Sequence, residues 1–344
     1  MTETVRDSLT VGQAGEKQVL ARVLGRLSNA ETASLGPGDD CAVLVTGAGS
    51  DTVVTTDTMI EGPDFRLAWH SGFELGWKLA ATNLSDVAAM GAVPTALTLA
   101  LAVPQPTPVS LLEDIAEGVD AACRTLAPGC GVVGGDLGTA PVIMAAVTAL
   151  GRVPSGTAVT RSGAREGDTV AYGGELGLAG LGLSLLFRDA SDDGVAHSRT
   201  LAALWQQHPE MLAAQLAPTP PIPLGVTAAH VGATSMMDVS DGLSLDAARL
   251  AKASGVSIGF DSVDLSAGFG LQHGVEVPID AMLQGGEDHG LLATFPPGVS
   301  MPEGFHAIGR VLGARPDPAL FLDGRPYAPT GWDPFAPIAI SRRG

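Results

Sequence analysis

Short apolar runs alternate along the chain with longer segments in which apolar residues recur at intervals of three or four. The short runs predict β-strands and the longer segments predict amphipathic helices, a succession typical of an α/β protein. In the first part of the chain we expect helices over residues 73–90 and 109–126, with Pro108 well placed to open the second. The accompanying strands are expected over residues 52–56, 95–103, 131–133 and 141–150.

A second series of elements follows Gly151. It comprises strands over 168–172, 235–238, 256–260, 291–295 and 307–311, helices over 178–187 and 243–254, and a proline-rich break over 218–223. With 344 residues, of which 45% are hydrophobic, the chain exceeds the usual length of one compact domain. We therefore predict an N-terminal domain of residues 1–153 and a C-terminal α/β domain of residues 154–344.

Acidic residues outnumber basic ones by 37 to 19, which gives a formal net charge of -18. This balance argues against a nucleic-acid partner. The first residues show no signal-peptide pattern and no apolar run is long enough to cross a bilayer, so we expect a cytoplasmic protein without a membrane partner. Cys41, Cys123 and Cys130 are odd in number and lack C-x-x-C spacing, which argues against a disulfide framework or a zinc site.

Acidic residues beside apolar elements are the chemically informative feature of the chain. Asp57 ends VVTTD and Asp136 ends GVVGGD, and we expect both at the carboxyl ends of strands, where open α/β sheets bind their ligands. The set occurs in both halves and comprises Asp40, Asp57, Asp86, Asp136, Asp238, Asp241 and Glu287. Its members lie mostly at junctions flanked by glycine, whose backbone N–H groups could cradle a phosphate.

Grouping such carboxylates without a cation would be costly, since two unit charges about 4 Å apart repel by roughly 4 kcal/mol at an effective dielectric constant near 20. Oxygen ligands favour Mg²⁺, Ca²⁺ or Mn²⁺ over zinc. For any one aspartate, a role in a turn or a helix cap explains the residue equally well, and we leave Asp39 and Asp288 in that class. For the set as a whole we favour metal chemistry.

Seven motifs in order resemble those of the thiamine-monophosphate kinase family, within the aminoimidazole-ribonucleotide-synthetase-like superfamily. They are GPGDDCAVL, TTDTMIEG, NLSDVAAMGAVPTALTLAL, GGD, TRSGAREGD, DVSDGL and GGEDHGLL, and they cover nearly the whole chain. The resemblance implies a two-domain α/β (α+β) fold and a homodimer whose N-terminal domains pair through their sheets. It also implies ATP-dependent phosphorylation of thiamine monophosphate to thiamine diphosphate by direct in-line transfer.

The resemblance further implies roles for individual residues, and the family motifs are matched position by position. The magnesium ligands, for several ions, would be Asp40, Thr55, Thr56, Asp57, Asp86, Asp136, Asp238 and Asp241. The ATP contacts would be Gly135, Asp136, Arg161 and Ser240, and Asp57, Asp86 and Asp136 would be the catalytic set. The contacts to thiamine monophosphate would be Glu287, Trp332 and the position of Asp64.

Asp64 departs from the family pattern, because the family usually has His at this position and this chain reads IEGPDF. Asp64 could bind the substrate differently or hold another cation, and the neighbouring Arg66 or His70 could replace the missing group. We expect the enzyme to work without the family contact, with Asp64 at most peripheral.

Two other function classes remain open at this point. One is another ATP-using superfamily member, either an amidine-forming synthetase or a selenophosphate synthetase, although the latter should carry a reactive Cys before Cys41 and none is present. The other is a non-catalytic protein that binds nucleotide or metal on the same scaffold. Because seven motifs agree in order, we favour the kinase.

Overall fold

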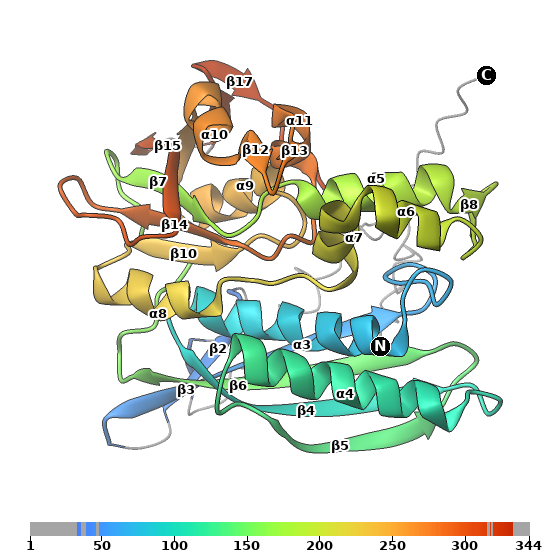
Figure 1. The fold of residues 1–344 in the computed structure, drawn as a ribbon. Coiled ribbons are helices and arrows are strands. Elements are labelled where there is room, and N and C mark those ends of the chain that lie inside the picture. Colours follow the sequence, from blue (N-terminus) through green and yellow to red (C-terminus); the bar gives the residue numbers. More distant parts are fainter. Residues whose placement is uncertain (1–32, 36–38, 46–47, 315–316, 318, 333–344) are drawn as a thin grey trace, which may run out of the picture.

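A computed structural model describes residues 33–35, 39–45, 48–314, 317 and 319–332. Two sheets with their helices form two halves that lie one above the other in Figure 1. Helix α3 (Gly72–Ala89) of the first half and α8 (Ile222–His230) of the second lie where the halves meet. No helix in the described part of the chain combines the length and apolar character needed to cross a membrane.

The first half contains a six-stranded sheet in the order β1-β2-β3-β6-β4-β5. Its neighbouring strands are antiparallel except for β4 and β5, which are parallel. The longest pairing joins β3 to β6, from Ser50 opposite Pro154 to Ile60 opposite Met144. The strands are β1 (Ala33–Leu35), β2 (Ala42–Val45), β3 (Ser50–Ile60), β4 (Val93–Val103), β5 (Val132–Thr139) and β6 (Met144–Pro154).

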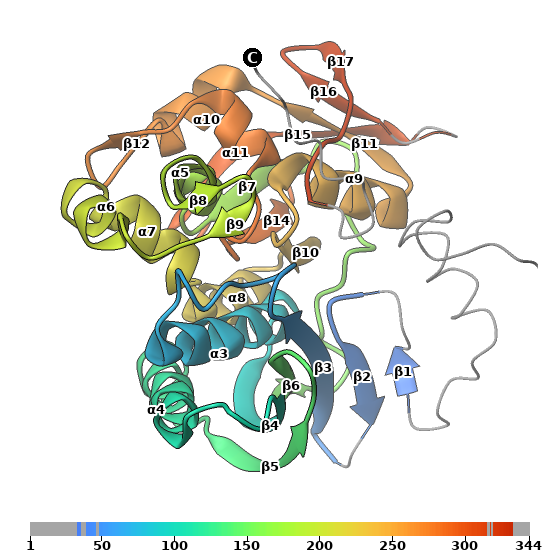
Figure 2. The same ribbon diagram turned by 90° about the vertical axis from the view of Figure 1, so that its right-hand side faces the viewer.

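Helices α3 and α4 (Val109–Leu126) cover one face of this sheet and pack closely on each other (Figure 2). Ser71 begins α3 with a capping box, in which its hydroxyl accepts from the Glu74 amide and the Glu74 carboxylate accepts from the Ser71 amide. A Cβ atom at Gly76 or Gly118 would lie 2.0 Å from a carbonyl oxygen of the opposite helix. Glycine at these two positions therefore permits the close contact between the helices.

The prediction that both helices are amphipathic holds for α4 but is wrong for α3. Helix α4 buries one face around Ile115 and Val119 and exposes the other. Helix α3 is buried on nearly every side, because the sheet, α4, and α7 (Pro209–Leu216), α8 and β10 (Ser235–Asp238) of the second half all contact it. Polar α3 residues such as Lys78 and Ser85 consequently lie inside the protein, where they require polar partners.

The second half contains a seven-stranded sheet in the order β10-β14-β7-β15-β11-β16-β17, antiparallel except between β11 and β16. Its other strands are β7 (Thr169–Gly173), β11 (Val256–Phe260), β14 (Leu291–Phe295), β15 (Phe305–Ala314), β16 (Leu320–Leu322) and β17 (Arg325–Tyr327). Two short hairpins are β8 (Ser191–Asp192) with β9 (Val195–Ala196), and β12 (Leu271–Gln272) with β13 (Val275–Glu276). The remaining helices are α5 (Leu178–Asp189), α6 (Leu201–Gln207), α9 (Leu243–Ser254), α10 (Ser262–Phe269) and α11 (Ile279–Gln284).

One hydrophobic core extends from the first half into the second. Leu84 and Val87 of α3 belong to the same buried cluster as Met236 of β10 and Phe295 of β14. A second cluster, which includes Tyr172 and Ile258, lies wholly within the second half. The halves are therefore joined by a continuous apolar contact, while the division at residue 153 stays a prediction.

Several elements agree to the residue with their predictions, namely α4, β10, α9, β11 and β14. The expectation for Asp57 and Asp136 is wrong, because both lie inside strands that continue three residues further, to Ile60 and Thr139. In β3 the polar run TTDT gives no sequence signal for a strand, and pairing with β6 is what keeps it extended. Helix α8 begins at Ile222 within the expected proline-rich break, since proline is tolerated in the first helical turn.

Candidate active site

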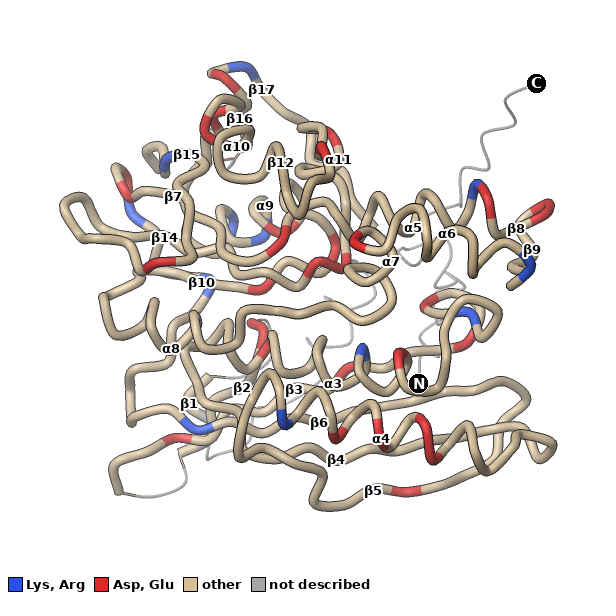
Figure 3. Tube along the Cα trace, viewed as in Figure 1, with Lys and Arg blue, Asp and Glu red and all other residues tan. Residues whose placement is uncertain are grey.

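A cavity of about 510 Å³ lies between the halves and collects acidic residues from both. Acidic positions recur along this boundary in the tube drawing (Figure 3). The lining residues are Asp39, Asp40, Thr55, Thr56, Asp57, Thr58, Met59, Asp64, Thr82, Asp86, Arg161, Asp238, Ser240, Asp241, Glu287, His289 and Trp332.

Strand β3 and helix α3 supply one wall of the cavity. Alternation along β3 puts Thr55 and Asp57 on the face that carries the buried Val53, toward α3. The Thr55 hydroxyl donates to Asp86 Oδ2 at 2.8 Å, and the Asp57 amide donates to Asn83 Oδ1 at 3.3 Å. These bonds hold the strand against the helix and present the Asp57 and Asp86 carboxylates to the same space.

Asp40 and Arg161 enter from two segments that are distant in sequence. The Arg161 guanidinium bonds to Asp40 Oδ1, and the Arg161 amide donates to Asp39 Oδ2 at 2.9 Å. Asp40 is buried, and its second oxygen, Oδ2, has no hydrogen-bond partner among the described residues. A buried carboxylate oxygen without a donor carries a large desolvation cost, which a bound cation would relieve.

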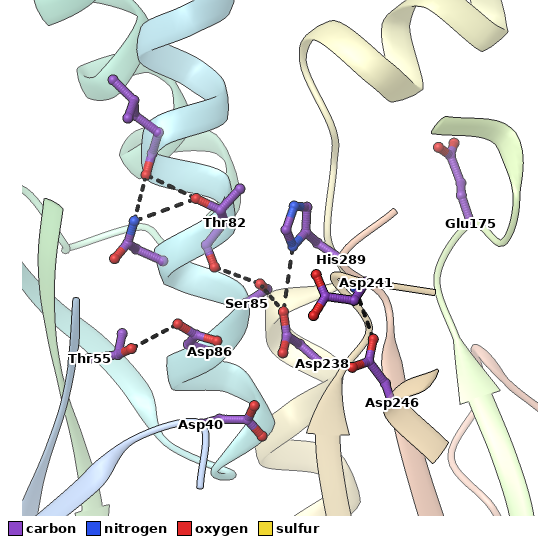
Figure 4. A network of polar contacts seen from close by, with 12 residues as sticks. Asp40, Thr55, Thr82, Ser85, Asp86, Glu175, Asp238, Asp241, Asp246 and His289 are labelled. Atoms are coloured by element: carbon purple, nitrogen blue, oxygen red, sulfur yellow. Dashed lines mark hydrogen bonds and ion pairs between the residues drawn. The ribbon is translucent and has the colours of Figure 1, made fainter. Parts of the chain in front are cut away.

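Asp238 ends β10 and completes the acidic group from the second half (Figure 4). The Ser85 hydroxyl of α3 donates to Asp238 Oδ2 at 3.1 Å, and His289 Nδ1 lies 3.5 Å from the same oxygen. One oxygen each of Asp40, Asp86 and Asp238 lies within 4.8 Å of the others. These three side chains, which we call the acidic triad, form an all-oxygen donor set that suits Mg²⁺ or Ca²⁺.

The carboxylates of the cavity differ in their electrostatics. Burial, together with neighbouring aspartates, raises the pKa of Asp40 and of Asp86 well above the ordinary range. Water reaches Asp57, yet the surrounding protein and the charge of Asp238 raise its pKa to about 6. Burial also tends to raise the pKa of Asp238, but His289 and Arg161 outweigh burial, and the pKa of Asp238 is lowered.

Asp241 lies just before α9 and is tied to that helix. Arg249 Nη1 contacts Asp241 Oδ2 at 2.5 Å and Asp246 Oδ1 at 2.6 Å. The Asp241 carbonyl accepts the amide of Trp332 at 2.9 Å. This bond, with the pairing of Thr330 to Ser244, lays the 330–332 segment on α9 and brings Trp332 to the edge of the cavity.

Glu287, in a segment with unusual backbone geometry, lines the cavity beside Lys78 of α3, which lies about 12 Å along the helix axis from Asp86. Glu287 therefore lies toward the other end of the cavity from the triad. Its φ is +69°, and that of His289 is +54°, values that non-glycine residues seldom adopt. The Glu287 amide donates to Ser240 O at 2.7 Å, which holds the segment beside the start of α9. Lys78 Nζ of α3 lies 3.0 Å from Glu287 Oε1, and the Gln215 side chain donates to Oε2.

Asp64 closes a tight turn at the edge of this end. Asp64 Oδ2 accepts the Ile60 amide at 2.8 Å, and the Asp64 amide donates to Ile60 O at 3.1 Å. Arg66 stacks at 4.7 Å from the ring centroids of both Trp69 and Phe187 and is not among the lining residues. His70 is buried outside the lining, and burial lowers its pKa to about 3.

Most sequence-predicted site residues meet in the cavity, but Gly135 and Asp136 do not. Both lie on β5, the edge strand of the first sheet, whose residues are all exposed. Thr56 faces away from α3 and its hydroxyl pairs with Thr148 at 2.7 Å, although the residue reaches the lining. Asp288, left among capping residues, accepts the amides of Gly177 and Ala179 at the start of α5, as that class predicts.

Sequence reasoning missed Lys78, Gln215, Ser85 and His289. Lys78 and Ser85 lie on helix α3, which the periodicity predicts to be partly exposed. Polar residues are expected on an exposed face, so nothing marks these two as site residues. His289 directly follows GGED in the motif GGEDHGLL, and this position beside Glu287 is a signal that could have identified it as a site residue. Gln215 lies near the end of α7, a helix that was not predicted at all.

The comparisons with known proteins cover both halves of the chain. Residues 38–153 match the family AIR synthase related protein, N-terminal domain. The thiamine-monophosphate kinase of Mycobacterium tuberculosis is 35% identical over 336 residues, covering 96% of this chain and 94% of the relative. That of Corynebacterium glutamicum is 34% identical over 340 residues, covering 97% of each.

Among solved structures, AaThiL complexed with AMPPCP and TMP superposes with a TM-score of 0.78 at 29% identity, covering 95% of this chain and 99% of that one. The expected aminoimidazole-ribonucleotide-synthetase-like α/β fold is thereby confirmed.

Proposed function

Because this chain belongs to the thiamine-monophosphate kinase family, we propose that it transfers the γ-phosphoryl group of ATP to the phosphate of thiamine monophosphate. The observation that carries the proposal is the acidic triad, whose oxygens converge within 4.8 Å inside an inter-half cavity. A structural relative binds AMPPCP and TMP together, which supports the same pair of substrates here.

The acidic triad fits a divalent cation by two criteria. Its donors are all carboxylate oxygens, and Asp40 Oδ2 is buried without a partner among the described residues. We infer that Mg²⁺ is held by the triad, with Thr55, Thr56, Asp57 and Asp241 completing the sites for further ions. When bound, it would neutralise charge on the phosphates.

The residues would act mainly by binding and orientation. A phosphate monoester with a second pKa near 6 is largely dianionic at pH 7, so the attacking oxygen needs no strong general base. In-line attack on the γ-phosphorus then requires alignment and compensation of charge. Arg161, which is paired with Asp40 of the triad, and Ser240 would contact ATP, while Glu287 and Trp332 would contact thiamine monophosphate.

An ATP-consumption assay with and without thiamine monophosphate tests the proposal. We expect ADP and thiamine diphosphate in equal amounts, and only when thiamine monophosphate and Mg²⁺ are both present. Consumption of ATP with an amidine precursor or selenide instead would indicate another superfamily activity. Nucleotide binding without any turnover would indicate a scaffold.

We also infer a cytoplasmic homodimer paired through the first sheet. Strand β5 is exposed along its whole length, with Val133 71% and Leu137 61% accessible. Such an apolar edge on a monomer favours pairing with a second copy, which would place Gly135 and Asp136 at the interface. Light scattering should give twice the chain mass of 34.8 kDa, and Val133→Asp should shift it to the monomer.

A further inference from the structure

Lys78 is a buried cation that the proposed mechanism does not use. It lies on α3 with none of its side chain exposed, and it is not among the residues that line the cavity. Its ammonium group lies 3.0 Å from Glu287 Oε1 and donates to the carbonyl of Gln215 at 2.9 Å. Burying a lysine is costly, and replacing a buried ion pair as a whole by apolar residues of similar volume is often at least as stable. A role beyond stability is therefore indicated.

Gln215 contacts the same pair from helix α7. Its side-chain amide donates to Glu287 Oε2, while its backbone carbonyl accepts from Lys78. Three residues from three segments thereby form a small network. Both oxygens of Glu287 thereby receive a donor from the protein interior. Gln215 is 2% exposed, and its own Oε1 has no partner among the described residues, so the side chain serves chiefly as a donor here.

Glu287 is the only member of this network that reaches the cavity. The side chain is 28% exposed, and its backbone is held at a φ of +69°. Lys78 and Gln215 outweigh the effect of burial and lower the pKa of Glu287, so the group is ionised at neutral pH. Both Glu287 oxygens already have a protein donor, whereas Asp40 of the triad keeps one oxygen without a partner among the described residues, so the triad is better suited to a metal.

We propose that Lys78, supported by Gln215, is a positioning residue that orients the Glu287 carboxylate toward the organic part of thiamine monophosphate. This inference rests on the proposed function. It predicts that disturbing the network affects one substrate selectively, whereas a purely structural role would reduce folded protein and affect both substrates alike. The triad, on the other side of the cavity, should bind ATP and metal as before.

Lys78→Met is the principal test, because it removes the charge and keeps a long unbranched side chain. We expect the KM for thiamine monophosphate to rise by about tenfold or more while the KM for ATP changes by less than about twofold. Lys252→Met, the same substitution at an exposed position on α9, is the matched control and should match the wild type. Equal changes in both KM values, or an unchanged KM for thiamine monophosphate, would overturn the proposal.

A milder variant and a double variant keep the test decisive if Lys78→Met folds poorly. Gln215→Met removes the donor to Oε2 but leaves the backbone acceptor for Lys78, and we expect a selective rise of roughly threefold in the same KM. The KM of Lys78→Met/Glu287→Gln should equal that of Glu287→Gln alone, because Lys78 acts through Glu287. Additive effects, or a silent Gln215→Met, would contradict the proposal.

Failure of the proposed function would look different. A wild-type chain that does not turn over thiamine monophosphate refutes the kinase activity. The network is then tested by thermal denaturation of four proteins: the wild type, Lys78→Met, Glu287→Gln and the double variant. Lys78→Met should lower Tm, and adding Glu287→Gln should restore part of the loss, because the buried carboxylate is no longer left unpaired. Independent effects on Tm would show that the two residues are not coupled.

Discussion

The two ends of the cavity hold carboxylates in opposite ways. At the triad end, Asp40, Asp86 and Asp238 crowd together, and Arg161 is the cation paired with Asp40. At the other end, Glu287 stands beside Lys78 with both of its oxygens bonded by the protein. Crowded carboxylates are stabilised by a bound cation, whereas Glu287 already has a protein donor at each of its oxygens. Under the proposed function, the triad end would bind metal and phosphate, and the Glu287 end would bind the organic part of the substrate.

Asp57→Asn should give the largest effect, at the triad end. If Asp57 holds metal as proposed, removing its charge weakens stabilisation of the transition state, so we expect kcat to fall by roughly a hundredfold or more at saturating Mg²⁺. Steady-state kinetics with thiamine monophosphate would measure this. Asp120→Asn, the same change on the exposed face of α4, is the control. A kcat near that of the wild type would make Asp57 a structural residue.

Glu287→Ala should give a smaller and selective effect at the other end. We expect the KM for thiamine monophosphate to rise by about tenfold or more, with the KM for ATP nearly unchanged, because the proposed role of Glu287 is to contact thiamine monophosphate alone. Initial rates at varied concentrations of each substrate check this. Equal losses for the two substrates would assign Glu287 to the metal site and remove the distinction between the ends.

Asp64→Ala should have a still smaller effect, since one Asp64 oxygen already accepts the Ile60 amide within its own turn. We expect kcat/KM for thiamine monophosphate to change by less than about tenfold, or roughly 1.4 kcal/mol. Asp64→Asn, which keeps an acceptor for the Ile60 amide, distinguishes loss of the turn from loss of charge. A hundredfold loss in both variants would make Asp64 a direct replacement for the family histidine.

The smallest expected effect is on stability without metal. The pKa of Asp57 is raised from 3.8 to about 6 in the folded protein, so ionising it opposes folding above that range. In metal-free protein at pH 7, Asp57→Asn should therefore raise Tm by roughly 2 °C or more. The advantage should shrink as the pH falls through 6 and vanish near 4, where the wild-type carboxyl is protonated. Calorimetry in a chelator across this range would test it, and a constant advantage would contradict it.

Local patterns were sufficient where an element is bounded by its own residues. Strands β10, β11 and β14 are short apolar runs, and helices α4 and α9 carry their periodicity from end to end, so their limits follow from sequence. The acidic motifs likewise contain all three members of the triad, together with other acids that lie outside it. These features depend on neighbouring residues, which a sequence displays directly.

Tertiary packing sets which side chains meet and how the surroundings of each carboxylate affect its charge. The extension of β3 past Asp57 depends on β6, which lies some ninety residues away, and the burial of Lys78 depends on α7 of the other half. Gly135 and Asp136 share the acidic, glycine-rich pattern of the triad yet lie outside its cavity. Pairing across such distances is set by the packing of whole elements, and no local pattern records it. Local motifs were therefore enough to predict the fold family and the candidate acids, whereas packing determined which partners those acids have.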